Sequence, residues 1–563
     1  MIIKKIIVII IIITYLFPFI SADAVGNNGV VTSSKQVASD IGIDILKNGG
    51  NAIDAAVAVA FALSVSHPSA GNLGGGGFMV INFPDGHSTT IDFREVAPLK
   101  SHKDMYLDSE GNVILGLSTL SALASGVPGS VFGLGYAHEK YGNLSWYDVV
   151  LPSVILAKFG FKLDAHNVSI LNNPYLKSKL SVDSYTKSIF TKNSLFKINE
   201  LFIQKDLAKT LNRIADYGYK EFYYGQTADM IVSFMNKNNG IISHEDLRTY
   251  SIVEAPPINF SYRNYNIISM PPSSSGGITL GIILNQLENY DFSNFSFHDA
   301  SHVHLLAEVE KRAYADRHQY LGDMQFIDVP IDYLLSDTHT NKLVDSIDFT
   351  KSSSSDLFGD SELILDLESE ETTHFSIVDS YGNAVSVTTT LNGWFGNGLC
   401  VEGAGFLMNN EMDDFSIKPG YPNMYGLIGS KANEIQPKKR MLSSMTPTIV
   451  TNLDGSPFLV LGSPGGSTII TTVAQIINNV IDFNMEIKDA VERKRFHHQW
   501  IPNQIQIEKH SLSNEVINKL EDMGHDIIYR SNVGIGEANC IMIVNDTYYG
   551  VGDSRRGGRA SAY

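Results

Sequence analysis

The chain has 563 residues, of which 44% are hydrophobic and 18% are charged; this composition supplies a large core and excludes a wholly disordered or fibrous protein. Lys and Arg total 42 against 60 Asp and Glu, and the formal net charge of −18 argues against general nucleic-acid binding, which needs basic surface. Two cysteines, Cys400 and Cys540, exclude a cysteine zinc site and a disulfide-dense scaffold, but leave one disulfide between them open.

The first segment, residues 1–24, predicts export. Lys4 and Lys5 precede an isoleucine-rich run that ends at Ile20, and small residues follow. The run is short for a spanning helix of about 20 residues, which favours a signal peptide, with an uncleaved anchor as the alternative. In both cases we expect the rest of the protein to be exported, whether periplasmic, secreted or at the cell surface.

Apolar spacing predicts helices within residues 36–63, interrupted at Gly49-Gly50. The sequence GNLGGGG, at 71–77, precedes a predicted strand at 78–83. A dinucleotide-binding loop follows a strand and opens a helix, so these glycines do not indicate a nicotinamide or flavin site. We expect them to allow close backbone packing.

Residues 200–345 are predicted to be mostly helical, and residues 351–371 form an acidic segment with few aromatic residues. This composition predicts a mobile or strained linker. Two strand patterns follow, at 374–379 and 384–392, and a Tyr-Gly-Asn turn between them predicts a hairpin.

Thr372 stands where the acidic segment meets the first of these strands. A threonine hydroxyl is a weak nucleophile without a neighbouring base, and an N-terminal threonine carries its own α-amine. At pH 7 roughly a tenth of such an amine is unprotonated, against roughly one in 2,500 for a lysine. If the chain is cut between Glu371 and Thr372, Thr372 becomes an N-terminal residue that can act as a nucleophile. The alternative is a structural role, which is commoner for a threonine at the start of a strand.

Three other patterns carry a functional and a structural alternative. The glycine-rich turn 462–467 lies between a predicted strand and a helix, where its N–H groups could form an oxyanion hole or only start the helix. Arg94 could bind a carboxylate, or pair with Asp92 or Glu95 at the surface. The polar cluster 409–414 could hold an ammonium group, or only form a turn.

Several histidines raise the possibility of a metal site, which we do not expect. No HExxH motif occurs, and the neighbouring acidic residues lack ligand spacing. Packed or solvent-facing roles are commoner for such histidines. Those considered are His302, His304, His318, His497 and His498.

Taken together, these segments resemble the γ-glutamyltranspeptidase family of N-terminal-nucleophile hydrolases. Ordered matches run along nearly the whole body of the chain. They include HPSAGNLGGGGFM at 67–79, DFREVAP at 92–98, GVPGS at 126–130, MPPSSSGG at 270–277, AEVEKRAYADRHQYLGD at 307–323, ETTHFSIVD at 371–379, TLNGWFG at 390–396, LMNNEMDDFS at 407–416, MLSSMTPT at 441–448, GSPGGS at 462–467 and RFHHQW at 495–500. One departure is Ser273, where many members have a proline.

The resemblance implies an α+β fold, a four-layer αββα sandwich built from one precursor that cleaves itself into two subunits. The cut would fall between Glu371 and Thr372, giving a large subunit of about residues 25–371 and a small catalytic subunit of 372–563. Thr372 would be the nucleophile. Thr390, which matches the family's second functional threonine, would orient it.

The resemblance also assigns a pocket. The α-carboxylate of a γ-glutamyl group would be bound by Arg94, Ser443 and Ser444, and its α-ammonium by Asn392, Glu411 and Asp414. Gly465 and Gly466 would supply the oxyanion N–H groups. Residues 418–440 resemble the family's lid loop, with Tyr425 at the gating position.

The activity implied is that of a γ-glutamyltransferase and glutathione hydrolase. It would act on glutathione and other γ-glutamyl compounds, transfer the group to water, an amino acid or a short peptide, and need no cofactor. A cephalosporin or glutaryl acylase of the same fold is one alternative. An inactive surface-binding homologue is another, although the intact threonines and double glycine speak against it.

Overall fold

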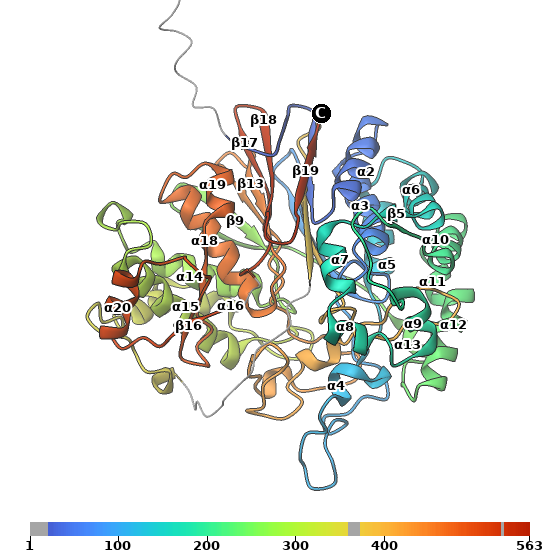
Figure 1. Ribbon diagram of the computed structural model, residues 1–563. Coiled ribbons are helices and arrows are strands. Elements are labelled where there is room, and N and C mark those ends of the chain that lie inside the picture. Colours follow the sequence, from blue (N-terminus) through green and yellow to red (C-terminus); the bar gives the residue numbers. More distant parts are fainter. Residues whose placement is uncertain (1–20, 359–371, 531–533) are drawn as a thin grey trace, which may run out of the picture.

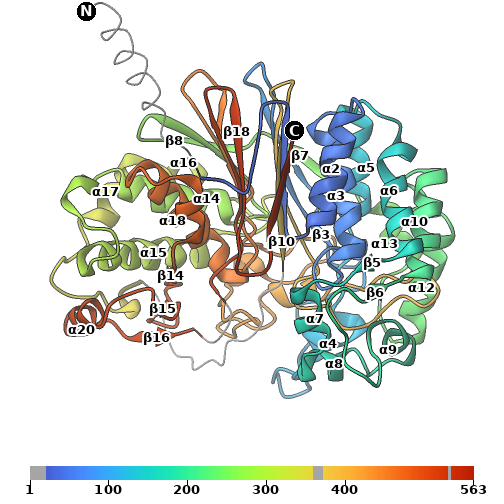
Figure 2. The same ribbon diagram turned by 45° about the horizontal axis from the view of Figure 1, so that its top comes forward.

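The computed structural model describes residues 21–358, 372–530 and 534–563. Its centre is a pair of seven-stranded antiparallel sheets packed face to face, with helices on both outer faces (Figures 1 and 2). The predicted four-layer αββα arrangement is therefore confirmed. Within the described ranges, no helix is both long and apolar enough to cross a bilayer.

The first sheet consists, in spatial order, of β1 (Ala24–Gly26), β18 (Thr547–Gly552), β17 (Asn539–Val544), β13 (Pro457–Leu461), β12 (Thr448–Thr451), β9 (Tyr265–Ser269) and β8 (Ile258–Tyr262). The second consists of β19 (Arg559–Ala562), β2 (Gly29–Ser33), β10 (Thr373–Asp379), β11 (Ala384–Thr390), β3 (Gly76–Asn82), β4 (Ser88–Asp92) and β7 (Val253–Ala255). Both sheets combine strands from before and after the predicted cleavage point.

Three hydrophobic cores hold the layers together. The core between the sheets includes Val80, Val378 and Ile449. A second core joins the outer face of the first sheet to α14 (Gly276–Leu287), α15 (Ala300–Tyr320), α18 (Ile469–Ile481), α19 (Ile487–Glu492) and α20 (Asn514–Asp522). The third joins the second sheet to α2 (Gln36–Lys47), α3 (Ala52–Ser66), α5 (Ser130–Tyr141), α6 (Trp146–Phe159), α10 (Lys205–Tyr217) and α12 (Gln226–Lys237).

The sequence predicted the helix interruption and the hairpin correctly. Helix α2 ends at Lys47, and α3 begins after Asn51, whose side chain accepts hydrogen bonds from the main-chain N–H groups of Ile53 and Asp54. Strands β10 and β11 pair antiparallel, with Thr373 opposite Thr389. Phe375 and Ile377 face the helices, whereas Val378 and Ala384 face the other sheet. Because side chains alternate along a strand, Thr390 at the end of β11 lies on the same face as Ala384, toward the other sheet.

The glycine-rich segment 71–77 serves close packing, as predicted. A Cβ on Gly75 would lie 2.1 Å from the main-chain oxygen of Thr390, and one on Gly74 would lie 2.2 Å from that of Leu407. Only glycine fits such approaches without a backbone shift. The segment therefore brings the chain directly against the end of β11.

Three predictions need correction or limitation. The predicted helical region 200–345 also contains the strands β7, β8 and β9. Of the predicted linker, residues 351–358 pack on the fold, with the Ser355 hydroxyl 2.5 Å from the Trp500 carbonyl oxygen, and residues 359–371 lie outside the described ranges. The open disulfide is not formed, because Cys400 and Cys540 are buried in different cores.

Candidate active site

A small cavity between the sheets brings together residues far apart in the sequence. Thr372 precedes β10, and its hydroxyl lies 3.5 Å from the Thr390 hydroxyl at the end of β11. The Thr390 hydroxyl in turn accepts a 2.8 Å hydrogen bond from the main-chain N–H of Asn392. The cavity is also lined by Arg94, Arg317, Asp414, Tyr425, Ser443, Ser444 and Gly466.

Arg94, which follows β4, is one of two buried arginines that line this cavity. Its guanidinium lies 2.7 Å from a carboxylate oxygen of Glu411 and 2.5 Å from one of Asp414. The predicted alternative of a surface pair with Asp92 or Glu95 is wrong, because Asp92 pairs with Arg440 and the Glu95 carboxylate makes no hydrogen bond with a described group. Burial opposes the charge on Arg94, but the two carboxylates outweigh it and raise its pKa.

The same contacts govern the two carboxyl groups. Burial raises the pKa of Glu411 well above its usual value and also raises the pKa of Asp414, while the Arg94 guanidinium lowers both. Glu411 to Asp414 form a short 3₁₀ helix rather than an isolated turn. Two buried carboxyl groups thus share the Arg94 guanidinium beside the cavity, and burial favours the protonated form of Glu411.

The predicted oxyanion donors lie at the start of α18. Gly465 has φ 139° and Gly466 has φ 55°, both in the range that side chains disfavour. Among the described residues, no group accepts a hydrogen bond from the N–H of either glycine. The Tyr425 ring covers Gly466 so closely that a Cβ there would lie 2.6 Å from it.

Ser443 and Ser444 form another wall of the cavity. The Ser443 main chain is fixed by Ser273 and Ser275, through hydrogen bonds of 3.1 and 2.7 Å. The Ser273 hydroxyl also donates a 2.9 Å hydrogen bond to the Asp92 carboxylate. The Ser444 hydroxyl accepts a 3.2 Å hydrogen bond from Arg317 on α15.

Arg317 was not predicted as a site residue. It lies on α15 and is 5% exposed, and its second contact is a 2.9 Å hydrogen bond to the Ser275 hydroxyl. An arginine in a long helix is most often a surface residue. The signal that could have identified it is its position within the matched segment AEVEKRAYADRHQYLGD.

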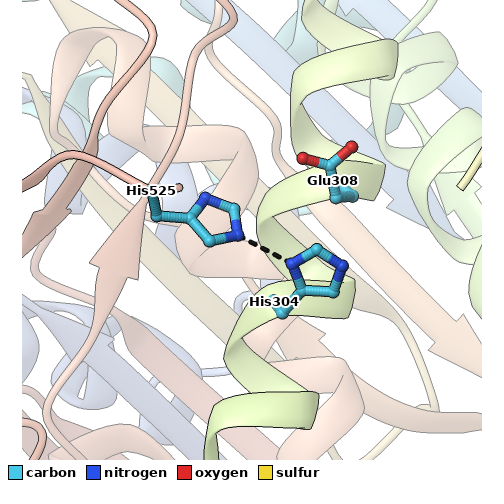
Figure 3. Close-up of side chains that lie close together, drawn as sticks. All are labelled: His304, Glu308 and His525. Carbon is cyan, nitrogen blue, oxygen red and sulfur yellow. Dashed lines mark hydrogen bonds between the residues drawn. The ribbon is translucent and has the colours of Figure 1, made fainter. Parts of the chain in front are cut away.

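The histidines that raised a metal question are mostly engaged with protein groups. His302 contacts Asn478, His497 contacts Thr471 and Gln499, and His318 contacts the Ile428 carbonyl. In Figure 3, His304 and Glu308 lie on one face of α15, and His525 points toward His304, with 2.7 Å between their ring nitrogens. Glu308 binds Lys311 and Arg312, which neutralise it.

Two facing antiparallel sheets between helical layers, with a threonine at the start of a central strand, define an N-terminal-nucleophile hydrolase. The model of one family in this class, described as gamma-glutamyltranspeptidase, matches residues 38–563, and this chain belongs to that family. The only segment before the match is residues 1–37.

Relatives that match along most of their length support this family membership. The chain is 46% identical over 529 residues to the glutathione hydrolase proenzyme of Escherichia coli K12, covering 94% of this chain and 90% of that protein. It is 43% identical over 537 residues to the proenzyme of the same name from Pseudomonas sp. strain A14, covering 94% and 93%.

Solved structures give the same result. Helicobacter pylori gamma-glutamyltranspeptidase is 42% identical with a TM-score of 0.55, over 59% of this chain and 93% of that one. A cephalosporin acylase from Bacillus halodurans shares the fold, with a TM-score of 0.85 over 98% of both chains, at 24% identity.

Proposed function

We propose that Thr372 is the nucleophile of a γ-glutamyltransferase and glutathione hydrolase, released when the precursor cleaves its own Glu371–Thr372 bond. The observation that carries the proposal is the 3.5 Å contact between the Thr372 and Thr390 hydroxyls, in the cavity that also contains Arg94 and Asp414. Family membership and the full-length proenzyme relatives support the activity.

Maturation would begin with attack of the Thr372 hydroxyl on the Glu371 carbonyl carbon. The peptide C–N bond breaks, the acyl group moves from nitrogen to oxygen, and the α-amine of Thr372 is freed. Water then hydrolyses this ester, which leaves the Glu371 carboxylate and restores the hydroxyl. The freed amine has a pKa near 8 and so serves as a base at neutral pH.

The two products would remain a heterodimer, since each sheet contains strands from both products that pair with one another. From the large subunit, β2 pairs with β10 and β19, and β3 pairs with β11. In the first sheet, β12 pairs with β9, and β1 with β18. Separation would break all these ladders, so the subunits stay associated after the cut.

In the reaction itself, the Thr372 hydroxyl attacks the γ-carbonyl of the donor while its proton passes to the α-amine. The N–H groups of Gly465 and Gly466 would stabilise the oxyanion. Collapse of the tetrahedral intermediate expels the leaving amine, which takes the proton, and leaves a γ-glutamyl ester. Water or the amine of an amino acid or short peptide then attacks this ester.

Selection of the γ-glutamyl group would follow from exchange of ion-pair partners. Arg94 is paired with Asp414 and Glu411. An incoming zwitterion would bring its carboxylate to Arg94, Ser443 and Ser444, and its ammonium to Asp414, Glu411 and Asn392. Arg317 would hold the Ser444 hydroxyl in place. Charge is thereby conserved, which limits the desolvation cost.

The same contacts argue against the glutaryl acylase alternative. A glutaryl amide has one free carboxylate and no ammonium, so it could displace the carboxyl groups from Arg94 without offering Asp414 a cation in return. Turnover of a γ-glutamyl anilide should therefore greatly exceed that of the matching glutaryl anilide. The reverse order would support the acylase. A single uncut band on denaturing gels together with no hydrolysis would support an inactive homologue.

The proposal extends to location. The apolar segment 1–20 supports export through a signal peptide, with the mature enzyme periplasmic, secreted or at the cell surface. Intact-protein mass spectrometry tests the proposed processing, since the small subunit should begin at Thr372 and the large one near residue 25. A mature fragment with another N-terminal residue would overturn the assignment of Thr372.

A further inference from the structure

Exposed apolar side chains are concentrated between Ile155 and Ile203, in the helical layer that covers the second sheet (Figure 2). Eight of the twenty-three large apolar side chains that are exposed in the described part of the chain fall within these 49 residues. Single exposed apolar residues are ordinary, whereas exposed apolar side chains that lie side by side mark an interaction surface.

Three of these side chains, those of Phe159, Leu201 and Ile203, lie around a short ladder of β5 (Phe161–Lys162) and β6 (Leu201–Phe202). Phe161 and Phe202 pair on its inner side, with ring centroids 5.9 Å apart. Because side chains alternate along a strand, the paired Lys162 and Leu201 face outward. Leu201 is 55% exposed.

Neighbouring side chains extend this apolar face. Phe159, at the end of α6, is 63% exposed, and Ile203 is 42% exposed. Gly160 joins them to the ladder, since a Cβ there would lie 2.8 Å from Ile203 Cγ1 and 3.1 Å from Leu201 Cδ1. The helix end and β6 therefore form one surface rather than scattered exposures.

The charge of this stretch is opposite to that of the protein. Residues 155–203 contain seven lysines and three acidic residues, whereas the whole chain carries −18. Of the seven, Lys179 has a buried ammonium group and Lys192 is paired with Glu200. Lys158 lies with its ammonium 5.4 Å from the centre of the Phe159 ring. Lys158, Lys162 and Lys197 form no ion pair with a described residue. Their charges are thus available to an anionic partner.

We propose that this surface, the ladder face with Phe159, Ile203 and the surrounding lysines, docks the enzyme on an anionic lipid bilayer. The apolar tips would enter the headgroup region while the lysine ammonium groups contact lipid phosphates. The acidic remainder of the protein would be repelled by the same bilayer, which fixes this face toward it. Protruding apolar tips among unpaired lysines favour a fluid lipid interface over a rigid acidic protein, which would need a complementary shape.

Vesicle co-sedimentation of the full mature enzyme tests the proposal. One set of vesicles is pure phosphatidylcholine, and the other has one part phosphatidylglycerol to two parts phosphatidylcholine. The variants are a charge triple (K158E, K162E, K197E) and an apolar triple (F159S, L201S, I203S). A charge-matched control triple (K342E, K351E, K519E) changes Lys342 on α17 (Asp337–Val344), Lys519 on α20, and Lys351, whose neighbour Ser352 donates a main-chain hydrogen bond to Met523 just after α20. Both helices lie across the molecule from β5 and β6 (Figure 2).

Wild type and the control triple should bind the anionic vesicles, more weakly as salt is raised, and should bind the neutral vesicles poorly. Both patch triples should lose roughly tenfold or more of the anionic binding. Hydrolysis of a γ-glutamyl substrate should be unchanged in every variant, which also shows that each is folded. Equal binding to both vesicle types, no binding to the anionic ones, or an equal loss in the control triple would overturn the proposal.

Discussion

The hydroxyl of Tyr425 donates a 2.6 Å hydrogen bond to the main-chain carbonyl of Asn392, so the proposed lid is fastened to the loop that follows Thr390. Both residues are buried, and the Tyr425 ring also covers Gly466. The lid therefore contacts two parts of the proposed machinery: the ammonium-binding loop and an oxyanion donor.

Tyr425→Phe removes this hydrogen bond and keeps the ring. We expect the KM for a γ-glutamyl donor to rise about fivefold, which corresponds to about 1 kcal/mol for a neutral hydrogen bond. Cleavage of the precursor should continue. Tyr425→Ala, which also uncovers Gly466, should have a larger effect. Steady-state kinetics measure the donor KM of each variant. Equal KM values for wild type and Tyr425→Phe would show that the Tyr425 hydroxyl has no role in donor binding.

Thr372→Ala should leave an uncut and inactive precursor, because the attacking hydroxyl is gone. Thr372→Ser keeps a hydroxyl and should still be cut, although more slowly. Thr388→Val is a matched control, since Thr388 is a buried threonine of the same hairpin whose hydroxyl contacts His374. It should yield two subunits on a denaturing gel. Normal subunits from Thr372→Ala would refute the nucleophile assignment.

Arg94→Ala should raise the donor KM roughly 100-fold, since charge-assisted hydrogen bonds contribute about 2–3 kcal/mol. It should also lower the Tm, because two buried carboxylates lose their shared cation. Arg94→Lys keeps the charge and should recover most of the Tm but little of the KM, as lysine lacks the fork that binds a carboxylate. An unchanged donor KM in Arg94→Ala would show that Arg94 does not bind the carboxylate of the donor.

The raised pKa of Asp414 predicts a pH dependence of binding. Burial disfavours its ionised form, so the carboxyl group is charged only above a pKa higher than its usual value. Ammonium binding needs the charged form. The donor KM should therefore fall as pH rises through this pKa, whereas Asp414→Asn should give a high KM that lacks this transition. Identical KM profiles for the two proteins would exclude Asp414 as the ammonium partner.

Local features of this fold could be predicted from the sequence, because they depend on neighbouring residues. The Gly49-Gly50 interruption, the β10–β11 hairpin and the turn before α18 are examples. The pairing of Arg94 with Asp414 could not, because the partners are 320 residues apart and only the fold joins them. The motif resemblance placed both residues in one pocket, but gave no indication that their side chains pair with each other.

Lys179 likewise gave no sequence signal. It ends α8 (Pro174–Lys179), and its ammonium donates hydrogen bonds of 2.9 and 2.6 Å to the main-chain carbonyls of Trp394 and Gly396. These carbonyls belong to the loop that begins with Asn392. Burial lowers the pKa of Lys179 to about 7, and no ion pair with a described carboxylate offsets it. The residue thus fixes this loop, which would belong to the proposed small subunit, from a helix of the proposed large subunit.

Lys179→Met keeps much of the side-chain volume but removes the donors, so the loop should loosen and the donor KM should rise several-fold, with cleavage intact. Between about pH 7 and pH 10 the unfolded lysine binds a proton that the folded one lacks, so this group makes the protein more stable as pH rises through that window. The Tm of Lys179→Met should lack this increment. Lys177→Met, on the same helix, is the control and should match wild type in both measurements. A Lys179→Met enzyme with the KM and the Tm profile of wild type would show that the contacts of Lys179 with Trp394 and Gly396 have no role in donor binding or stability.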